Sequence, residues 1–350
     1  MKKKIGIITL CGNNNYGNKL QNYAIIKTLE QNGYDPETIW IYSAKNGIKS
    51  NLGDFYWRKK QDIIVNPKRS RIFKSFNKYL NIKNHVLFKK DMCKVAKKYD
   101  ALLVGSDQVW NPDYFTNNSV YLLTGVKKKK ISFSASFGVN NIPENKKNDY
   151  KKGLLELNAI SVREERGKEL VKELSGRKDA EVLIDPTMLL AAEEWDKIAK
   201  KPEQVPKKYI LNYFLGNLTD NRKEAIEKLA KERNCEIINI LDKNGLFYNT
   251  GPSEFLYLEK HAELVCTDSF HSCVFAIIFN RPFVVFDRIE PGVEKMNSRI
   301  ETLLRKFNLK EHAYNNEITD KCFKHNYTEA YKILEAEKKK SVAFLRDNLK

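Results

Sequence analysis

The stretch LVCTDSFHSCVFAIIFNRPFVVF, residues 264–286, contains the pattern that decides the fold. In it an apolar run ends in polar residues, a strongly apolar segment of helical length follows, and a second apolar run begins after Pro282. Unbroken apolar runs are typical of parallel strands that are covered on both faces. The stretch therefore predicts a strand, a polar turn, a helix and a second strand parallel to the first.

The same alternation extends over most of the chain. We expect strands at residues 4–10, 38–42, 101–104, 130–134, 159–162, 181–184, 209–213, 236–240, 264–267 and 283–286. We expect helices at residues 21–32, 191–200, 220–233 and 298–307. Repeated strand–helix units indicate the α/β class with parallel sheets.

A polar stretch at residues 200–208, which contains Pro202 and Pro206, separates two such series. A chain of 350 residues is long enough for two domains. We therefore expect two Rossmann-like parallel-sheet domains that face a cleft. The predicted bounds are residues 1–195 for the first domain, 196–325 for the second, and 326–350 for a C-terminal helix that can pack back on the first.

The chain is strongly basic, with a formal net charge of +18. Residues 58–98 contain 14 Lys and Arg but only two acidic residues, so they hold +12 of this charge. Within them, apolar residues at helical spacing alternate with Arg71, Lys74 and Lys78. Such a helix can lie on an anionic membrane, bind an acidic substrate, or pack its apolar face on its own domain. No nucleic-acid-binding module is recognisable, so we expect no nucleic-acid partner.

No apolar run approaches the roughly 18 residues that a membrane-spanning helix needs. The N-terminal lysines and the apolar residues 5–11 resemble a signal peptide but lack a small-residue cleavage pattern, so we interpret them as the first strand. The six cysteines include no C-x-x-C pair, which favours reduced thiols and disfavours a zinc site. We expect a cytoplasmic protein, with peripheral attachment to the inner face of the membrane left open, as is the oligomeric state.

Two polar loops follow predicted strands of the first domain, where parallel sheets bind ligands. The first, CGNNNYGNKLQ at residues 11–21, offers backbone N–H groups at a helix start and suits an anionic or polyhydroxylated ligand; a glycine turn with Asn caps is the structural alternative. The second, GSDQVWNP at residues 105–112, holds Asp107, which can accept from sugar hydroxyls or act as a base, and Trp110, which offers a flat apolar face. The residues we expect to contact ligand here are Asn13, Tyr16, Gly17, Asn18, Gln21, Gly105, Ser106, Asp107 and Trp110.

Two further side chains suggest chemistry. Arg163 directly follows a predicted buried strand, where a guanidinium can clamp a carboxylate or phosphate; an ion pair with Glu164 or Glu165 is the alternative. His271 lies near the start of an apolar helix and can give or take a proton near neutral pH, although a single His is more often structural.

The ordered set of motifs resembles the polysaccharide pyruvyl transferase family. The resemblance rests on GNNNYGNKLQNYA, GSDQVWNP, SASFG, SVREERG, IDPTMLL and TDSFHSCVFAIIFNRPFVVF, in that order over residues 5–286. It implies a two-lobed fold similar to the B-type glycosyltransferases. It also implies transfer of pyruvate from phosphoenolpyruvate to a saccharide, a polysaccharide precursor or a lipid-linked oligosaccharide, as a cyclic ketal.

The resemblance implies roles for individual residues. Arg163 corresponds to an arginine at the donor and His271 to the histidine that acts as acid, with Ser269, Phe270 and Ser272 expected to line the donor site. Asp107 is the candidate base, and the two polar loops form the acceptor side. The resemblance implies phosphoenolpyruvate as a co-substrate, and we expect no other cofactor and no metal.

One departure from the family matters. Its better-understood members have an arginine shortly before the histidine, where this chain has Asp268, Ser269 and Phe270. Either another basic group replaces that arginine or the donor differs. The alternative function is therefore a nucleotide-sugar-dependent glycosyltransferase of the same fold.

Overall fold

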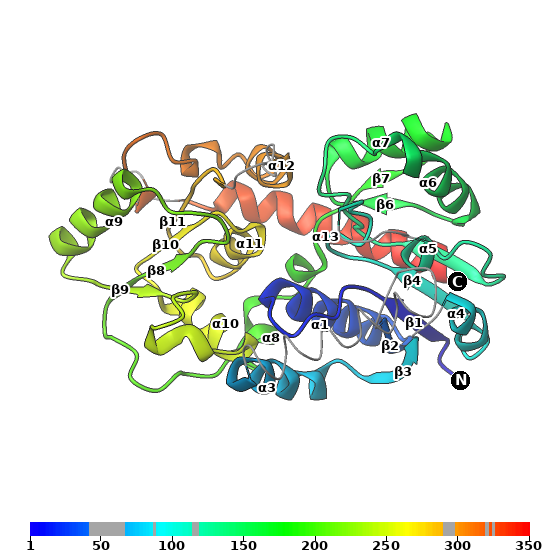
Figure 1. The fold of residues 1–350 in the computed structure, drawn as a ribbon, viewed down its shortest axis with the longest axis horizontal. Helices are drawn as coiled ribbons and strands as arrows, with labels where there is room; N and C mark the ends of the chain where they lie inside the picture. The colour runs from blue at the N-terminus through cyan, green and yellow to red at the C-terminus, as the bar shows by residue number, and fades with distance from the viewer. Residues whose placement is uncertain (42–66, 87–88, 114–118, 290–297, 319–321, 324–325) are drawn as a thin grey trace. The chain divides into compact units, whose positions relative to one another are not determined.

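The computed structural model describes residues 1–41, 67–86, 89–113, 119–289, 298–318, 322–323 and 326–350 (Figure 1). The chain divides into two compact units, residues 1–190 with 337–350 and residues 191–336. The first unit thus ends at Leu190, five residues before the predicted bound. None of the helices in these described ranges combines the length and the apolar character needed to cross a membrane.

The first unit is built on a sheet of five parallel strands in the order β3-β2-β1-β4-β5. The strands are β1 (Lys4–Ile8), β2 (Asp35–Ile41), β3 (Ile82–Val86), β4 (Ala101–Val104) and β5 (Lys129–Ser132). A parallel pair, β6 (Ser161–Val162) and β7 (Glu181–Val182), continues beyond β5 through bridges such as Ala135 with Val162. The apolar runs of β1 and β4 lie in the core because helices cover both faces of the sheet.

The helical elements of the first unit are α1 (Tyr16–Gln31), α3 (Pro67–Ser75), η2 (Phe76–Tyr79), α4 (Lys89–Ala96), α5 (Ser119–Leu122), α6 (Glu144–Glu156), α7 (Glu165–Ser175) and η3 (Pro186–Leu189). Asn15 caps α1, because its side chain accepts a hydrogen bond from Asn18 N at 3.1 Å. Gly176 ends α7 in the left-handed conformation with φ of 77°.

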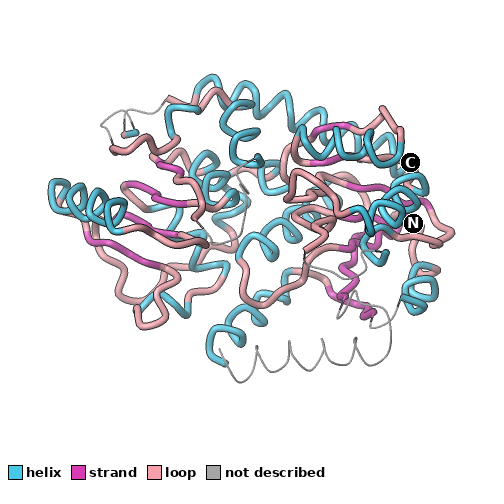
Figure 2. Tube along the Cα trace, turned by 45° about the horizontal axis from the view of Figure 1, so that its top comes forward, coloured by secondary structure: helices cyan, strands magenta, loops and turns pink. Residues whose placement is uncertain are grey.

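The second unit has four parallel strands in the order β11-β10-β8-β9. They are β8 (Tyr209–Tyr213), β9 (Glu236–Asn239), β10 (Leu264–Thr267) and β11 (Phe283–Val285). The helical elements are α8 (Ala192–Asp196), α9 (Asp220–Arg233), η4 (Leu246–Asn249), α10 (Pro252–His261), α11 (Phe270–Ile278), α12 (Ser298–Lys306) and η5 (Lys310–His312). In each unit the helices flank the strands (Figure 2).

The last helix, α13 (Thr328–Leu349), contributes residues to both units. Its residues 337–349 belong to the first unit, where Phe344 is buried with its ring 6.3 Å from that of Phe133. Arg346 Nε donates to Asn32 Oδ1 at 2.8 Å. Its residues up to 336 belong to the second unit, where Tyr331 donates to Ile277 O at 3.0 Å.

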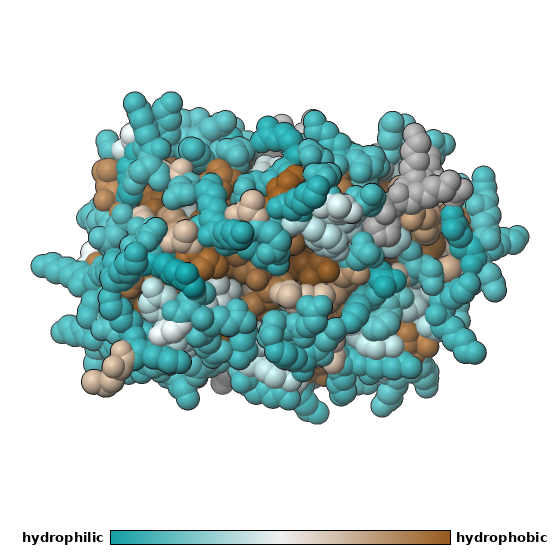
Figure 3. All heavy atoms as spheres, turned by 180° about the vertical axis from the view of Figure 1, so that it is seen from behind, coloured by the Kyte–Doolittle hydropathy of each residue, from teal (hydrophilic) through white to brown (hydrophobic). Residues whose placement is uncertain are grey.

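The structure confirms the α/β class and the ten predicted strands, and it adds β3. That strand has the sequence IKNHV and lies inside the basic stretch. Its polar residues interrupt the apolar run by which the other strands were predicted. Helix α1 begins at Tyr16 rather than residue 21, because the polar loop residues are already helical. The face shown in Figure 3 is covered mostly by hydrophilic side chains, as the large charge implies.

Candidate functional site

The turn between β10 and α11 in the second unit is fixed by its own side chains. Thr267 Oγ1 donates to Tyr213 O at 2.7 Å and accepts from Ser269 N at 3.0 Å. Ser269 is the N-cap residue of α11, and its side chain makes no capping hydrogen bond. The first backbone N–H groups of this nine-residue helix therefore face the turn, where helix ends favour anions.

Asp268 joins this turn to the end of β8. Its carboxylate accepts from Leu215 N and from Gly216 N, both at 2.7 Å. Arg288 donates from Nη2 to Asp268 O at 3.1 Å, and its Nε lies 3.4 Å from the Asp268 carboxylate. A Cβ on Gly216 would lie 2.7 Å from Arg288 Cγ, so only glycine allows this close approach. A cationic side chain is thus held directly against the turn that precedes His271.

His271 lies in the first turn of α11 with 7% of its surface exposed. The ring stands edge-on to Phe270, with the centroids 5.4 Å apart. An imidazole at a helix start can supply a proton to an anionic ligand, which is the task of a general acid. The predicted donor-side residues Ser269, Phe270, His271 and Ser272 therefore lie together in the structure, and all four are buried.

A buried carboxyl group supports the next residue of the helix. Ser272 Oγ donates to Glu259 Oε1 at 2.5 Å, and Glu259 on α10 has no exposed surface. Burial raises the pKa of Glu259 well above its usual range, and the hydrogen bond from Ser272 opposes that effect only in part. Burial therefore favours the protonated, neutral form of this carboxyl group. Nothing in the sequence distinguished this glutamate from exposed ones, so its burial was not predicted.

In the first unit, Arg163 is a buried member of an ion-pair cluster. Its Nη1 lies 2.6 Å from Asp185 Oδ2 and its Nη2 lies 3.3 Å from Asp107 Oδ1, with 1% of the side chain exposed. Burial disfavours the charged guanidinium, but the charges of Asp185 and Asp107 outweigh this penalty and raise the pKa of Arg163. Asn18 Nδ2 donates to Asp107 Oδ2 at 2.5 Å, and Ser106 Oγ donates to Asp185 Oδ2 at 3.0 Å.

From the sequence, Arg163 was expected either to clamp a carboxylate or phosphate of the ligand or to pair with Glu164 or Glu165. The contacts in the structure are different. Glu164, one of the two expected partners, instead accepts from Ser136 Oγ at 2.9 Å and from Phe137 N at 3.0 Å. Asp185, which the sequence analysis did not single out, is the closest partner of Arg163. Two carboxylates already surround the guanidinium, so the geometry favours a structural role over a phosphate clamp.

The other predicted acceptor-side residues of the first unit are also engaged internally. Gln21 Oε1 accepts from Ser106 N at 3.1 Å, next to the cis Gly105–Ser106 bond. A Cβ on Gly105 would meet Phe133 O at 2.2 Å. Asn13 accepts from Lys19 at 3.0 Å, and Tyr16, next to the buried Gly17, accepts from Arg69 at 3.2 Å. The loop is thus tied to its own domain.

Trp110 was predicted to offer a flat apolar face to a ligand, but the structure does not bear this out. It has no exposed surface, its Nε1 donates to Tyr121 O at 3.1 Å, and its ring packs 5.2 Å from that of Phe137. The structure therefore places this indole in the core of the first unit. One aromatic residue after a polar turn can lie in the core or contact a ligand, and the sequence alone did not distinguish these two positions.

The predicted residues therefore form two groups. Asn18, Gln21, Ser106, Asp107 and Arg163 lie in one network of the first unit, whereas the donor-side residues from Ser269 to Ser272 lie in the second. Arg288, a basic residue that the sequence did not single out, contacts the turn before His271 through Asp268. It could have been found only from its contact with Asp268, because the two are 20 residues apart.

Comparisons with known proteins agree with this architecture. The UDP-GlcNAc 2-epimerase of Neisseria meningitidis has a TM-score of 0.51 at 11% identity, covering 100% of this chain and 99% of that one. The UDP-GlcNAc 2-epimerase of Methanocaldococcus jannaschii has a TM-score of 0.50 at 16% identity, covering 96% of this chain and 92% of that one. At these identities the likeness concerns the fold alone. Two Rossmann-like units of the B-type glycosyltransferase kind are thereby shown.

At the level of sequence, no curated protein matches the chain. The model of one family does, and its description is polysaccharide pyruvyl transferase. It covers residues 15–290, which include both candidate regions described above. The chain therefore belongs to the polysaccharide pyruvyl transferase family.

Proposed function

We propose that this transferase takes its pyruvyl group from phosphoenolpyruvate and attaches it to two hydroxyls of a saccharide as a cyclic ketal. Family membership supports pyruvyl transfer to a polysaccharide in general. The observation that carries the choice of donor is the β10–α11 turn, where His271 lies at a helix start and Arg288 is held against Asp268. An acid, a cation and helical N–H groups suit a donor with a carboxylate and a phosphate.

The reaction requires a proton at one end of the donor and a nucleophile at the next carbon. His271, in its protonated form, gives a proton to the terminal methylene, which becomes a methyl group and leaves the adjoining carbon electrophilic. A sugar hydroxyl attacks that carbon and loses its proton to a base, and the C–O bond to phosphate breaks. A second hydroxyl then attacks the same carbon and loses its proton, which closes the ketal.

Arg288 fills the role that the sequence left open before His271. Where an arginine is expected, this chain has Asp268, Ser269 and Phe270, and the carboxylate and carbonyl oxygens of Asp268 hold Arg288 in place. The cation is thus supplied from the segment after β11 rather than from the turn itself. Asp107 remains the predicted base for the acceptor, and its bonds to Asn18 and Arg163 fix the orientation of its carboxylate.

The acceptor is proposed to be a polysaccharide precursor or a lipid-linked oligosaccharide. A lipid-linked acceptor would give a reason for the exposed basic residues Arg71, Lys74 and Lys78 on α3 and η2. Lys89 and Lys90, which the sequence groups with them, have side chains outside the described residues.

The test is phosphate release followed by ³¹P NMR. With phosphoenolpyruvate and a saccharide acceptor, inorganic phosphate should appear only when both substrates are present, together with a new methyl singlet of the ketal in the ¹H spectrum. Cleavage of a UDP-sugar under the same conditions, with phosphoenolpyruvate intact, would instead establish a glycosyltransferase. The Arg288→Met variant should raise KM for phosphoenolpyruvate, and an unchanged KM would remove Arg288 from the donor site.

A further inference from the structure

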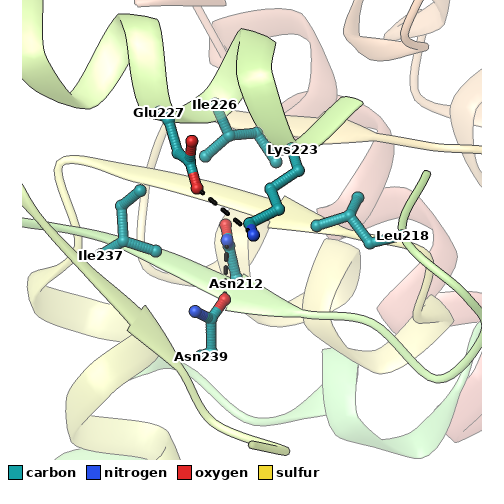
Figure 4. A pocket seen from close by; sticks show the side chains of 7 residues that line it. All are labelled: Asn212, Leu218, Lys223, Ile226, Glu227, Ile237 and Asn239. Atoms are coloured by element: carbon teal, nitrogen blue, oxygen red, sulfur yellow. Dashed lines mark hydrogen bonds and ion pairs between the residues drawn. The ribbon is translucent and has the colours of Figure 1, made fainter. Parts of the chain in front are cut away.

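A pocket of about 230 Å³ lies in the second unit, between α9 and the ends of β8 and β9 (Figure 4). Its apolar lining comes from Leu218, Ile226 and Ile237. Its polar lining comes from Asn212, Lys223, Glu227 and Asn239. Parallel sheets of this kind bind ligands outside the carboxyl ends of their strands, which is where this pocket lies.

Asn212 leaves a buried acceptor at this pocket. The residue is 5% exposed, and its Nδ2 donates to Asn239 Oδ1 at 2.9 Å. Its Oδ1 is buried and has no hydrogen-bond partner among the described residues. A buried polar atom without a partner costs free energy, and a ligand that brings a donor into the pocket removes that cost.

The charges that line the pocket balance one another. Lys223 Nζ lies 3.8 Å from Glu227 Oε1, one helical turn along α9 (Figure 4). This pair offers hydrogen-bond donors and acceptors but no net charge, so it gives an anion such as phosphoenolpyruvate no advantage. A neutral ligand whose hydroxyl groups both donate and accept matches the four polar side chains better.

The volume of the pocket and the lack of aromatic residues in its described lining limit which ligands it can bind. The seven described lining residues include no aromatic side chain on which a nucleobase could stack. The volume of about 230 Å³ is below the roughly 300 Å³ at which sites for larger organic ligands begin, so a nucleotide sugar would not fit inside. A single sugar ring has the required hydroxyls, and its C–H face can pack on Ile226 and Ile237.

We propose that this pocket binds one neutral sugar unit of the saccharide substrate. A sugar hydroxyl donates to Asn212 Oδ1, and neighbouring hydroxyls bond to Asn239, Lys223 and Glu227. The choice of a sugar rests on the proposed function, but the site is distinct from the β10–α11 turn and requires no pyruvyl donor.

The test is ligand-observed NMR and calorimetry on the full chain without phosphoenolpyruvate. The probes are D-glucose, D-galactose, N-acetyl-D-glucosamine, D-glucuronate and UMP. At least one neutral sugar should bind with a millimolar Kd, more tightly than glucuronate or UMP. Asn212→Leu should weaken that binding about tenfold, and the surface variants Lys223→Met and Glu227→Leu about threefold.

A matched control lies on the same helix. Lys228 and Glu232 form the same kind of pair five residues further along α9, at 4.0 Å, but do not line the pocket. Lys228→Met and Glu232→Leu should therefore leave sugar binding unchanged. The proposal is overturned if no neutral sugar binds, if the Lys223 and Glu227 variants bind as well as the control variants, or if UMP binds more tightly.

The result is distinguishable from failure of the proposed function. Ketal formation from phosphoenolpyruvate without sugar binding at this pocket would reject the pocket and retain the function. Sugar binding that depends on Asn212 and Lys223, without any phosphate release from phosphoenolpyruvate, would retain the pocket and reject the donor.

Discussion

The two units place polar residues at the same topological position, the carboxyl ends of their parallel strands, but use them differently. In the first unit, Arg163, Asp107 and Asp185 satisfy one another in a cluster that is almost completely buried. In the second, Asp268 holds Arg288 against the turn that leads to His271. The partners therefore favour a structural role for Arg163 in the first unit, where Asp107 stays a predicted base, whereas the turn of the second unit is the proposed donor site.

The largest effect should come from His271, if the second unit serves the donor. His271→Ala should lower kcat by about 10²–10⁴-fold because the general acid is lost, and the fold should be retained. Steady-state phosphate release and the circular dichroism spectrum measure the two quantities. The control is His261→Ala, since His261 is exposed at the end of α10. Near-normal turnover of the His271 variant would place the chemistry elsewhere.

Arg163 provides the converse test in the first unit. Arg163→Met leaves two buried carboxylates without their cation, so the free energy of unfolding should fall by about 3–5 kcal/mol. Arg166 is the matched control, since it pairs with Glu169 and Glu173 but 24% of its side chain is exposed. Arg166→Met should cost about 1 kcal/mol or less.

Urea denaturation measures both changes in the free energy of unfolding. If Arg163→Met keeps its stability and loses affinity for phosphoenolpyruvate, Arg163 is a donor clamp as the sequence predicted. In that case the first unit would also bind the donor, and the two units would no longer differ in this respect.

A smaller effect concerns Glu259, whose folded-state pKa lies well above its usual 4.5. Folding then takes up a proton between pH 4.5 and that raised pKa, so the free energy of unfolding should fall as pH rises through this window. Each pKa unit between the folded and unfolded states corresponds to about 1.4 kcal/mol in the free energy of unfolding. Glu259→Gln keeps the acceptor for Ser272 and should abolish this decline, which gives greater stability at pH 8 and little change at pH 4.

The control for this pH dependence is the exposed Glu263, and Glu263→Gln should leave the decline in place. Thermal unfolding at a series of pH values measures it. If the difference in stability between the wild type and Glu259→Gln does not change over this range, the folded-state pKa of Glu259 is not raised.

The fold was predictable because its signals are local. Several strands are short apolar runs, such as ALLV of β4 and LVCT of β10, whereas β3, with its charged and polar residues, was not predicted. For the candidate site, the sequence predicted where the polar turns lie, at the ends of strands, but not which side chains contact one another. The partners join residues far apart, such as Arg163 with Asp185 at 22 residues and Asp268 with Gly216 at 52, and one sequence does not encode such pairs visibly.

The smallest effect that we predict is on membrane binding, and it depends on a difference in charge between the surface helices of the two units. Helix α9 carries lysines that pair with glutamates four residues on, whereas α3, PKRSRIFKS, has no acidic residue. Arg71, Lys74 and Lys78 are exposed, but Phe73 and Phe76 are buried in the first unit. Attachment through α3 and η2 would therefore be electrostatic, without insertion of these two rings.

Basic residues close to an anionic membrane surface contribute roughly 1 kcal/mol each, and the attraction fades within a Debye length of about 8 Å at physiological salt. We expect binding to vesicles that contain phosphatidylserine and not to pure phosphatidylcholine vesicles, with release at 0.5 M salt. Replacing Arg71, Lys74 and Lys78 with Gln should weaken co-sedimentation. The same change at the exposed Lys207, Lys228 and Lys231 of the second unit should have a smaller effect. Equal weakening by the two triple variants would mean that net charge, rather than α3, draws the protein to the surface.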